Sequence, residues 1–396
     1  MLKNRNIKKN EIIMLLGRVT SKLGNIVFDY ANSVQLVSMF QKKSIILAIY
    51  QSTESIISII FNLIGGAVAD KGSKKRILIS TDILGGILCF VVAALSSHKY
   101  IAVAMIIANV LLGIITAFNS PTYKSIIKEI TINERIQSYN SIQNACGEII
   151  QICGPIVGAF LVGFIGVKGA LVFDGITFLL SAIVECFLVI KTQVLTETRK
   201  RTGHVIADII DGFKYLLKEK KILAVISIAA FINFFMSGYN LLIPYTNIMY
   251  ERVASNFYAK ILVAQSLGGV LGSIVNTRIK SNSMRVMSVF LLIMGFVMMV
   301  VPLTSRTNVP VIMLVPFFLF AFCVTIYNIR FVTYVHLNSK PEFIGRVFSI
   351  ISTVSIMFVP IGAFVMSAIC TTSQDTSFPV IGIGIALFSG ISFFLK

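Results

Sequence analysis

Polar and charged side chains recur at helical spacing within the first long apolar stretch of the chain. They follow one another at steps of four or three residues, which places all of them on one face of a helix: Arg18, Lys22, Asn25, Asp29 and Asn32. Ionisable groups inside an apolar helix usually face a water-filled cavity, where they can bind a polar solute or carry a proton. The alternative is that they only form hydrogen bonds with neighbouring helices.

A second apolar stretch, in the later half of the chain, has a polar face at the same steps. Its members are Asn233, Ser237, Asn240, Pro244 and Asn247. Two equivalent helices that each present a polar face predict a water-filled cavity between two halves of the molecule. We expect a solute site in that cavity, near the middle of the membrane.

The carboxylates within the apolar stretches are the candidate proton carriers: Asp29, Glu54, Asp82, Glu148, Asp174 and Glu185. A carrier must reach both its charged and its neutral state, and burial and nearby cations shift that balance in opposite directions. We expect Asp29 to be the leading group, because it lies at mid-depth with Lys22 and Arg18 on the same face. Asp82 and Asp174 lie nearer the starts of their stretches, so we expect them to be structural.

Three residues are secondary candidates for the site: Glu148, Asp174 and Arg330. Glu148 directly follows Gly147 in an apolar stretch and is the next proton carrier to consider after Asp29. Arg330 either pairs with an acid across the cavity or anchors the end of its helix at the membrane surface.

These groups require a framework of helices in lipid. Of the 396 residues, 56% are hydrophobic and only 13% are charged, whereas an average soluble domain has about 25% charged residues. A helix that crosses the bilayer needs about 20 mostly apolar residues. The sequence therefore predicts an all-α integral membrane protein with twelve spans: 12–38, 45–68, 77–96, 101–120, 139–164, 170–190, 222–248, 257–277, 285–303, 309–332, 344–369 and 377–395.

The formal charge of +18 comes from basic residues that lie mostly in every second gap between the apolar stretches. Such a bias marks the cytoplasmic gaps of a membrane protein. We therefore expect both termini in the cytoplasm, which agrees with an even number of spans. The same distribution argues against a nucleic-acid partner.

The two halves of the chain share a pattern. The run Pro155-Ile-Val-Gly-Ala-Phe160 returns as Pro360-Ile-Gly-Ala-Phe364, and Glu134 and Glu342 each stand seven residues before a Ser-Ile pair. This pattern predicts two parallel six-helix repeats. The expected organisation is an N-terminal six-helix bundle, a cytoplasmic central loop with an amphipathic surface helix, and a C-terminal six-helix bundle: 1–190, 191–221 and 222–396.

The gap between the second and third stretches reads Gly66-Ala-Val-Ala-Asp70-Lys71-Gly-Ser73-Lys74-Lys75-Arg76-Ile-Leu78. It resembles the signature loop of the major facilitator superfamily, with Ser73 in place of the usual turn glycine. The resemblance implies the fold of that superfamily and a gating motif at Gly66, Asp70, Lys71, Lys74 and Lys75. A carboxylate such as Asp70 can lock one face shut by pairing with a cation or a helix N-terminus. The alternative for the basic residues is that they only anchor the topology.

The fifth stretch carries Gly147, Gly154, Pro155 and Gly158, which resemble the glycine–proline element of drug:proton antiporters. We expect these glycines to give a smooth face for close helix packing. The start of the sixth stretch, together with residues 211–215, resembles the macrolide-efflux and siderophore-exporter branch of the superfamily. Asn109 departs from that pattern, because many drug:proton antiporters have an arginine there, four residues before a glycine.

The resemblance implies a secondary transporter that works by alternating access and exports a small drug- or metabolite-like molecule in exchange for protons. We expect a monomer in a bacterial cell membrane, with no cofactor and no metal. The sequence has no Gly-rich phosphate loop and no His or Cys metal motif, which argues against an enzyme. The alternatives are a proton-coupled importer of a small nutrient and a transporter-like receptor that binds its ligand without moving it.

Overall fold

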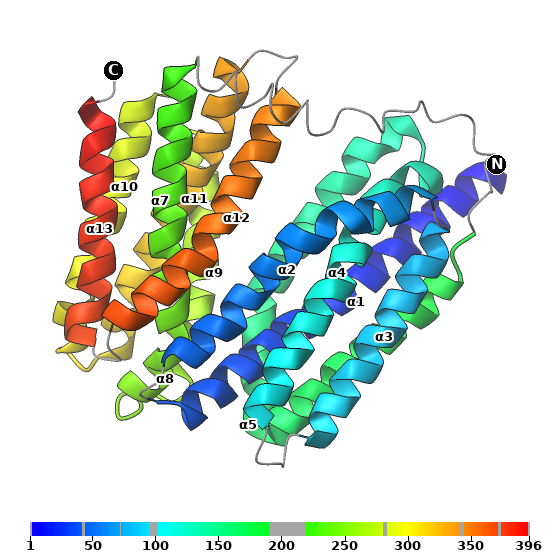
Figure 1. Ribbon diagram of the computed structural model, residues 1–396, viewed down its shortest axis with the longest axis horizontal. Coiled ribbons are helices and arrows are strands. Elements are labelled where there is room, and N and C mark those ends of the chain that lie inside the picture. Colours follow the sequence, from blue (N-terminus) through cyan, green and yellow to red (C-terminus); the bar gives the residue numbers. More distant parts are fainter. Residues whose placement is uncertain are drawn as a thin grey trace. The chain divides into compact units, whose positions relative to one another are not determined.

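The computed structural model describes residues 2–41, 44–71, 73–95, 101–189, 219–279, 283–339, 344–370 and 374–394. All regular secondary structure in these ranges is helical. The chain forms two compact units, shown with their helix labels in Figure 1. Unit 1 consists of Met1–Met39 with Thr53–Thr196, and unit 2 consists of Phe40–Ser52 with Glu197–Lys396.

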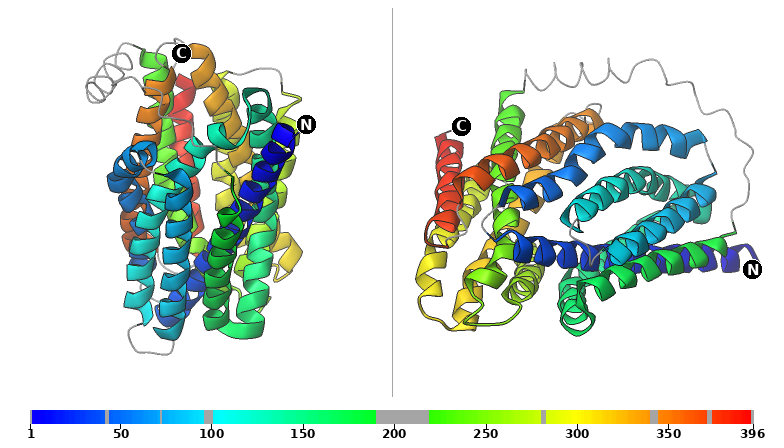
Figure 2. Two further views of the ribbon diagram at one scale, coloured as in Figure 1. Left: turned by 90° about the vertical axis from the view of Figure 1, so that its right-hand side faces the viewer. Right: turned by 60° about the horizontal axis from the view of Figure 1, so that its bottom comes forward.

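Unit 1 is built from long helices, of which α5 packs on both α1 and α3. They are α1 (Leu2–Met39), the larger part of α2 (Ser44–Lys71), α3 (Lys74–Leu95), α4 (Ile101–Ile130) and α5 (Asn133–Cys186). In both views of Figure 2, α1 in dark blue lies beside the green end of α5. The polar positions of the first span are therefore carried by a helix that packs closely along α5.

The 54-residue helix α5 is two passes joined at Gly166, whose φ of 72° and ψ of 176° are not helical. Its first arm, 133–165, follows α1 in the same direction, because Gly147, Gly154 and Gly158 meet successive residues of α1. Its second arm, 167–186, runs the opposite way along α1. A left-handed φ suits glycine because it has no Cβ. The chain thus turns back at the gap expected between the fifth and sixth spans.

Unit 2 contains six further long helices, with two short ones after the first. In chain order these are α7 (Lys220–Leu242), η1 (Ile243–Tyr245), α8 (Thr246–Met249), α9 (Phe257–Asn276), α10 (Met284–Ser305), α11 (Pro310–Asn338), α12 (Ile344–Ile369) and α13 (Gln374–Phe394). Together with the six passes that begin with α1, the described residues form twelve long helical passes. Seven described segments satisfy the length and apolar composition of a membrane span, including the segment that contains the turn at Gly166. The expected all-α membrane fold is confirmed.

The beginning of α2 belongs to unit 2 because its polar groups bind there. Ser44 Oγ donates to the carbonyl of Ser367 on α12 at 3.0 Å. Gln51 Nε2 donates to the carbonyl of Asn240 on α7 at 3.1 Å. α2 therefore contributes its first turns to one unit and its remainder to the other.

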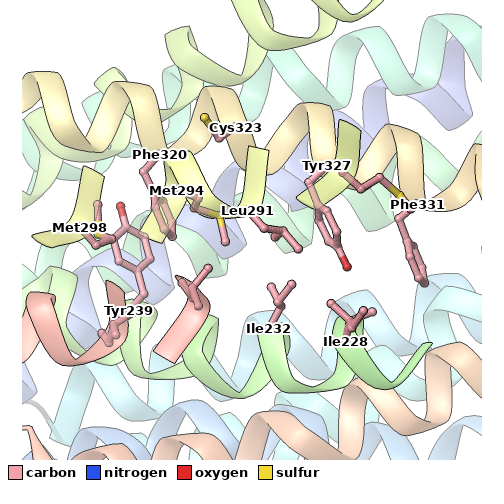
Figure 3. Close-up of a cluster of buried hydrophobic side chains, with 14 of the residues drawn as sticks. Ile228, Ile232, Tyr239, Leu291, Met294, Met298, Phe320, Cys323, Tyr327 and Phe331 are labelled. Carbon is pink, nitrogen blue, oxygen red and sulfur yellow. The ribbon is translucent and has the colours of Figure 1, made fainter. Parts of the chain in front are cut away.

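The core of unit 2 is formed by apolar side chains of α7 that face α10 and α11 (Figure 3). Tyr239 is fully buried, and its ring lies 4.3 Å from that of Phe320, centroid to centroid. Its hydroxyl accepts a hydrogen bond of 2.7 Å from Gln265 Nε2. Glycines bring the backbones close, since a Cβ at Gly268 would lie 2.2 Å from the carbonyl oxygen of Phe318.

The helices agree with the predicted spans along most of the chain and differ mainly at their ends. α1, α4 and α11 extend beyond the apolar stretches into polar residues, because a helix does not have to end where lipid ends. The amphipathic helix predicted within 191–221 falls almost entirely outside the described residues, as does the motif at 211–215.

Candidate functional site

Two lysines of the signature loop, Lys74 and Lys75, bind the ends of other helices in unit 1. Lys75 Nζ donates to the carbonyl oxygens of Cys186 and Leu188, at 2.7 Å each. These carbonyls end the second arm of α5, where a cation is favoured because the C-terminal end of a helix is partly negative. Lys74 forms an ion pair with Glu129 at the end of α4. The start of α3 therefore fastens the ends of two other helices.

The rest of the signature loop is described only by its backbone. Gly66, Asp70 and Lys71 lie in the last turns of α2. Their side chains lie outside the described part of the structure. The gating role of Asp70 therefore stays a prediction.

Glu11 fastens the start of α1 to the connection between α4 and α5. Arg135 donates to both of its carboxylate oxygens, from Nε at 2.9 Å and from Nη2 at 2.5 Å, and the Thr131 hydroxyl adds a third hydrogen bond. Because hydrogen bonding to Arg135 favours the charged form, the pKa of Glu11 is lowered from its ordinary value, although burial opposes this. This contact and the two lysines make one end of unit 1 a network of charged groups.

A half-buried cation and two buried carboxylates lie inside unit 1. We call them the charge cluster: Arg18 on α1, Asp82 on α3 and Glu185 on the second arm of α5. Asp82 is 2% exposed and Glu185 is 3% exposed. The charge of Arg18 acts on both carboxylates, and the carboxylates act on each other. The Arg18 guanidinium lies over the ring of Tyr123 on α4, 4.7 Å from its centroid. This cation–π contact helps to hold a cation away from bulk water.

Asp82 is held by neutral donors as well as by Arg18. Its Oδ1 accepts a hydrogen bond of 3.1 Å from Asn119 Nδ2, and its Oδ2 accepts one of 3.4 Å from Ser21 Oγ. Asn119 also donates to Thr81 Oγ1 at 2.9 Å. These contacts favour the ionised form of Asp82, which the sequence led us to regard as structural.

Glu185 has a different environment from Asp82. Its Oε2 has no hydrogen-bond partner among the described residues, and neither has the hydroxyl of Ser181, one turn earlier. Both side chains pack against α1 at Gly17, where a Cβ would lie 3.1 Å from Ser181 Oγ and 3.4 Å from Glu185 Cγ. Within the described part of the chain, Glu185 Oε2 and the Ser181 hydroxyl thus lack hydrogen bonds on the same face of α5, and the charge of Arg18 acts on Glu185.

Asp174 is the third buried acid of this interface and is fully buried. It accepts hydrogen bonds of 3.2 Å from Cys89 Sγ and from Thr177 Oγ1. Together with the charge cluster it reveals a polar face on the second arm of α5, at steps of three and four residues: Asp174, Thr177, Ser181 and Glu185. The sequence carried this signal, which matches the small residues of α1 that pack on it.

We call the polar face of α1 the polar stripe: Arg18, Lys22, Asn25, Asp29 and Asn32. Its side chains differ in exposure and in partners. Arg18 belongs to the charge cluster, and Lys22 Nζ donates to the carbonyl of Gly147 at 3.2 Å. Asn25 is half-buried and Asn32 is fully buried, whereas Asp29 is exposed. Asp29 is therefore the accessible acid of the stripe.

The glycine–proline element of α5 packs on α1. A Cβ at Gly154 would lie 2.7 Å from Ile26, and one at Gly158 would lie 3.2 Å from Tyr30. Pro155 is buried within the same turn. The side chain of Glu148 lies outside the described part of the structure.

The polar residues of unit 2 mostly bind backbone groups. Asn233 Nδ2 donates to the carbonyl of Ala229 on its own helix at 2.9 Å, and Ser237 Oγ donates to that of Val359 at 2.7 Å. Asn240 is exposed. Arg330 donates to the side chain of Asn276 at 2.6 Å and to carbonyls at the end of α9. Arg330 thus caps a helix, as Lys75 does in unit 1.

The chemistry that these groups offer is proton binding and recognition of a polar solute. Within the described residues, no group of three or more His, Cys, Asp or Glu side chains could hold a metal ion.

The sequence profile of the Major Facilitator Superfamily matches residues 26–363. The chain belongs to this superfamily. The MFS-type transporter YkuC of Bacillus subtilis is 23% identical over 365 residues, which are 88% of this chain and 81% of YkuC. Macrolide efflux protein A of Streptococcus pyogenes is 20% identical over 312 residues, 77% of this chain and 75% of that protein.

Among solved structures, a bacterial homologue of the iron transporter ferroportin in its inward-facing state has a TM-score of 0.75. The two chains are 15% identical, and the match covers 97% of this chain and 98% of the homologue. This likeness concerns the fold. The protein is therefore a multi-pass membrane transporter of the Major Facilitator Superfamily, a class that binds small molecules and lies in a lipid bilayer.

Proposed function

We propose that this transporter exports a small organic molecule in exchange for protons. The observation that carries the direction of transport is the similarity to macrolide efflux protein A along three quarters of both chains. The glycine–proline element of α5, which resembles that of drug:proton antiporters, supports the same direction. The solute is drug- or metabolite-like.

The buried acids of unit 1 support coupling to protons. A carboxylate at membrane depth is costly in its charged form, so it must be paired, hydrated or protonated. The charge cluster sets one cation against two such carboxylates. A proton that binds to the cluster on one side of the membrane and leaves it on the other would couple transport to the proton gradient, which needs no cofactor.

Asp29 is proposed as the acid that meets the solute, because it is exposed and lies on the polar face of α1. Asp70 is proposed as the gate at the end of α2, and both termini are proposed to lie in the cytoplasm of a bacterial cell. The protein is proposed to act as a monomer whose two six-helix bundles alternate access.

Accumulation in cells tests the proposal. A bacterial strain without its own drug pumps is loaded with radiolabelled erythromycin and with a panel of lipophilic dyes, with and without the protein. Export predicts lower accumulation of at least one compound in cells that have the protein, and a protonophore should abolish the difference. Higher accumulation in those cells would instead identify an importer, and binding without a change in accumulation would identify a receptor.

A further inference from the structure

The charge cluster does not balance its charges when all three groups are ionised. Arg18 contributes one positive charge, and Asp82 and Glu185 contribute two negative charges. Both carboxylates are almost completely buried. A net negative charge in such a place has no water to solvate it, so one further positive charge is required.

We propose that the charge cluster is a proton-binding site that holds a single exchangeable proton on Glu185. A proton makes the cluster neutral, because the charge of Arg18 then balances that of Asp82. The other charged or titratable groups that face the cluster within the described residues are Tyr123 on α4, Tyr139 on the first arm of α5 and Asp174 on the second arm. None of these adds a positive charge.

The hydrogen bonds decide which carboxylate takes the proton. Asp82 accepts from Asn119 and Ser21 in addition to facing Arg18, and all three contacts favour an anion. Glu185 Oε2 receives no hydrogen bond among the described residues. An oxygen without donors is a poor place for negative charge and a suitable place for a proton.

Protonation of Glu185 also gives the Ser181 hydroxyl a hydrogen-bond partner. A protonated Glu185 becomes a donor, and the Ser181 hydroxyl one turn away, which itself favours the charged form of Asp82, has lone pairs that can accept from it. Both groups pack against the same position of α1, at Gly17. Because Gly17 has no side chain, both groups lie close to the backbone of α1 there.

The proton can exchange because Arg18 of the cluster and Asn119, which binds Asp82, are only half-buried. They connect the cluster with the surface of unit 1. The use of this site in coupling rests on the proposed function. The existence of the site does not, because proton binding is measurable without any transported solute.

Difference infrared spectroscopy of the full-length protein in liposomes at neutral pH tests the site. A protonated carboxyl group has a C=O stretching band of its own, distinct from that of a carboxylate. Glu185→Gln should lose one such band relative to the wild type, and the wild-type band should shift in D₂O. Glu251→Gln makes the same chemical change at an exposed acid and should leave the band unchanged.

Asp82→Asn distinguishes charge balance from burial alone. This variant leaves one carboxylate for one cation, so Glu185 should ionise and its band should vanish although Glu185 is still present. A band that survives in Asp82→Asn would overturn the shared-charge account. A wild type and Glu185→Gln with identical spectra, or a band that does not shift in D₂O, would overturn the exchangeable proton. If a pH gradient does not drive transport of solute, the proposed function fails, and these spectra still decide the site.

Discussion

Among the charged residues of unit 1, exposure separates two kinds of acid that the sequence placed together as candidate proton carriers. Asp29 is exposed on the polar face of α1, whereas Asp82 and Glu185 are buried between helices. An exposed acid on the polar face can attract a polar solute. A buried acid beside a single cation is suited to exchange protons.

Replacement of Asp29 by Asn should weaken solute binding without removing the response to pH. Loss of one charged hydrogen bond should raise the apparent KM about tenfold. Initial rates of transport in proteoliposomes, measured at several pH values, provide the check. If Asp29→Asn abolished pH-driven transport but preserved exchange of solute, Asp29 would be the proton carrier instead.

The contact between Glu11 and Arg135 should make stability depend on acidity. The pKa of Glu11 is lowered in the folded protein, so the stabilisation is fully present above its unfolded value of about 4.3 and is lost as the pH falls through the folded value. Thermal unfolding should therefore show a smaller loss of Tm on acidification for Glu11→Gln than for the wild type. Equal losses would mean that the contact contributes nothing in solution.

At the scale of helices, the apolar stretches predicted the spans because about 20 apolar residues are a strong signal. The residues of the polar stripe do lie on one continuous helix, α1. Its contacts were not predictable, because Arg18 meets Tyr123, Asp82 and Glu185 from three other parts of the chain. The spacing of residues within one helix does not identify the side chains of other helices that contact them. The roles of Lys74 and Lys75 were missed for the same reason, since their partners are at the ends of distant helices.

Gly24 should tolerate no side chain, because a Cβ there would lie 2.0 Å from Thr177 Oγ1 and 2.2 Å from Asp174 Oδ1. Gly24→Ala should cost about 1–3 kcal/mol through overpacking and should lower the yield of folded protein. Gly163→Ala is the matched control, because nothing lies within 4 Å of a Cβ at that position. Fluorescence-detected size exclusion after heating measures both variants. Equal thermal stability would show that α1 and α5 are not packed as described.

Lys75 should matter more for stability than Lys74, although the two are neighbours in the signature loop. Lys75 caps the second arm of α5 through two carbonyls, so Lys75→Ala should cost about 1–2 kcal/mol. Lys74 forms a partly exposed ion pair, and Lys74→Ala should cost roughly 0.2–1 kcal/mol. Thermal unfolding of both variants in detergent gives the comparison. The reverse order would show that the cap at the end of α5 contributes less than the ion pair of Lys74.

At the scale of the whole molecule, membership of the Major Facilitator Superfamily was predictable from the signature loop and the twelve apolar stretches. Direction and coupling are finer properties, because importers and exporters share the fold and differ in a few side chains. In this chain Asn109 stands where many drug:proton antiporters have an arginine. The proposed coupling to protons therefore needs a cation and an acid at other positions. The charge cluster offers one that already includes an arginine.

The most direct test of proton-coupled export is uptake of an identified solute into proteoliposomes under imposed pH gradients of both signs. An antiporter moves protons out as solute moves in, whichever way the protein is inserted. We therefore expect an acidic interior to drive accumulation of the solute above its equilibrium level. Accumulation driven by an alkaline interior, or accumulation that is the same with either gradient, would contradict proton-coupled export.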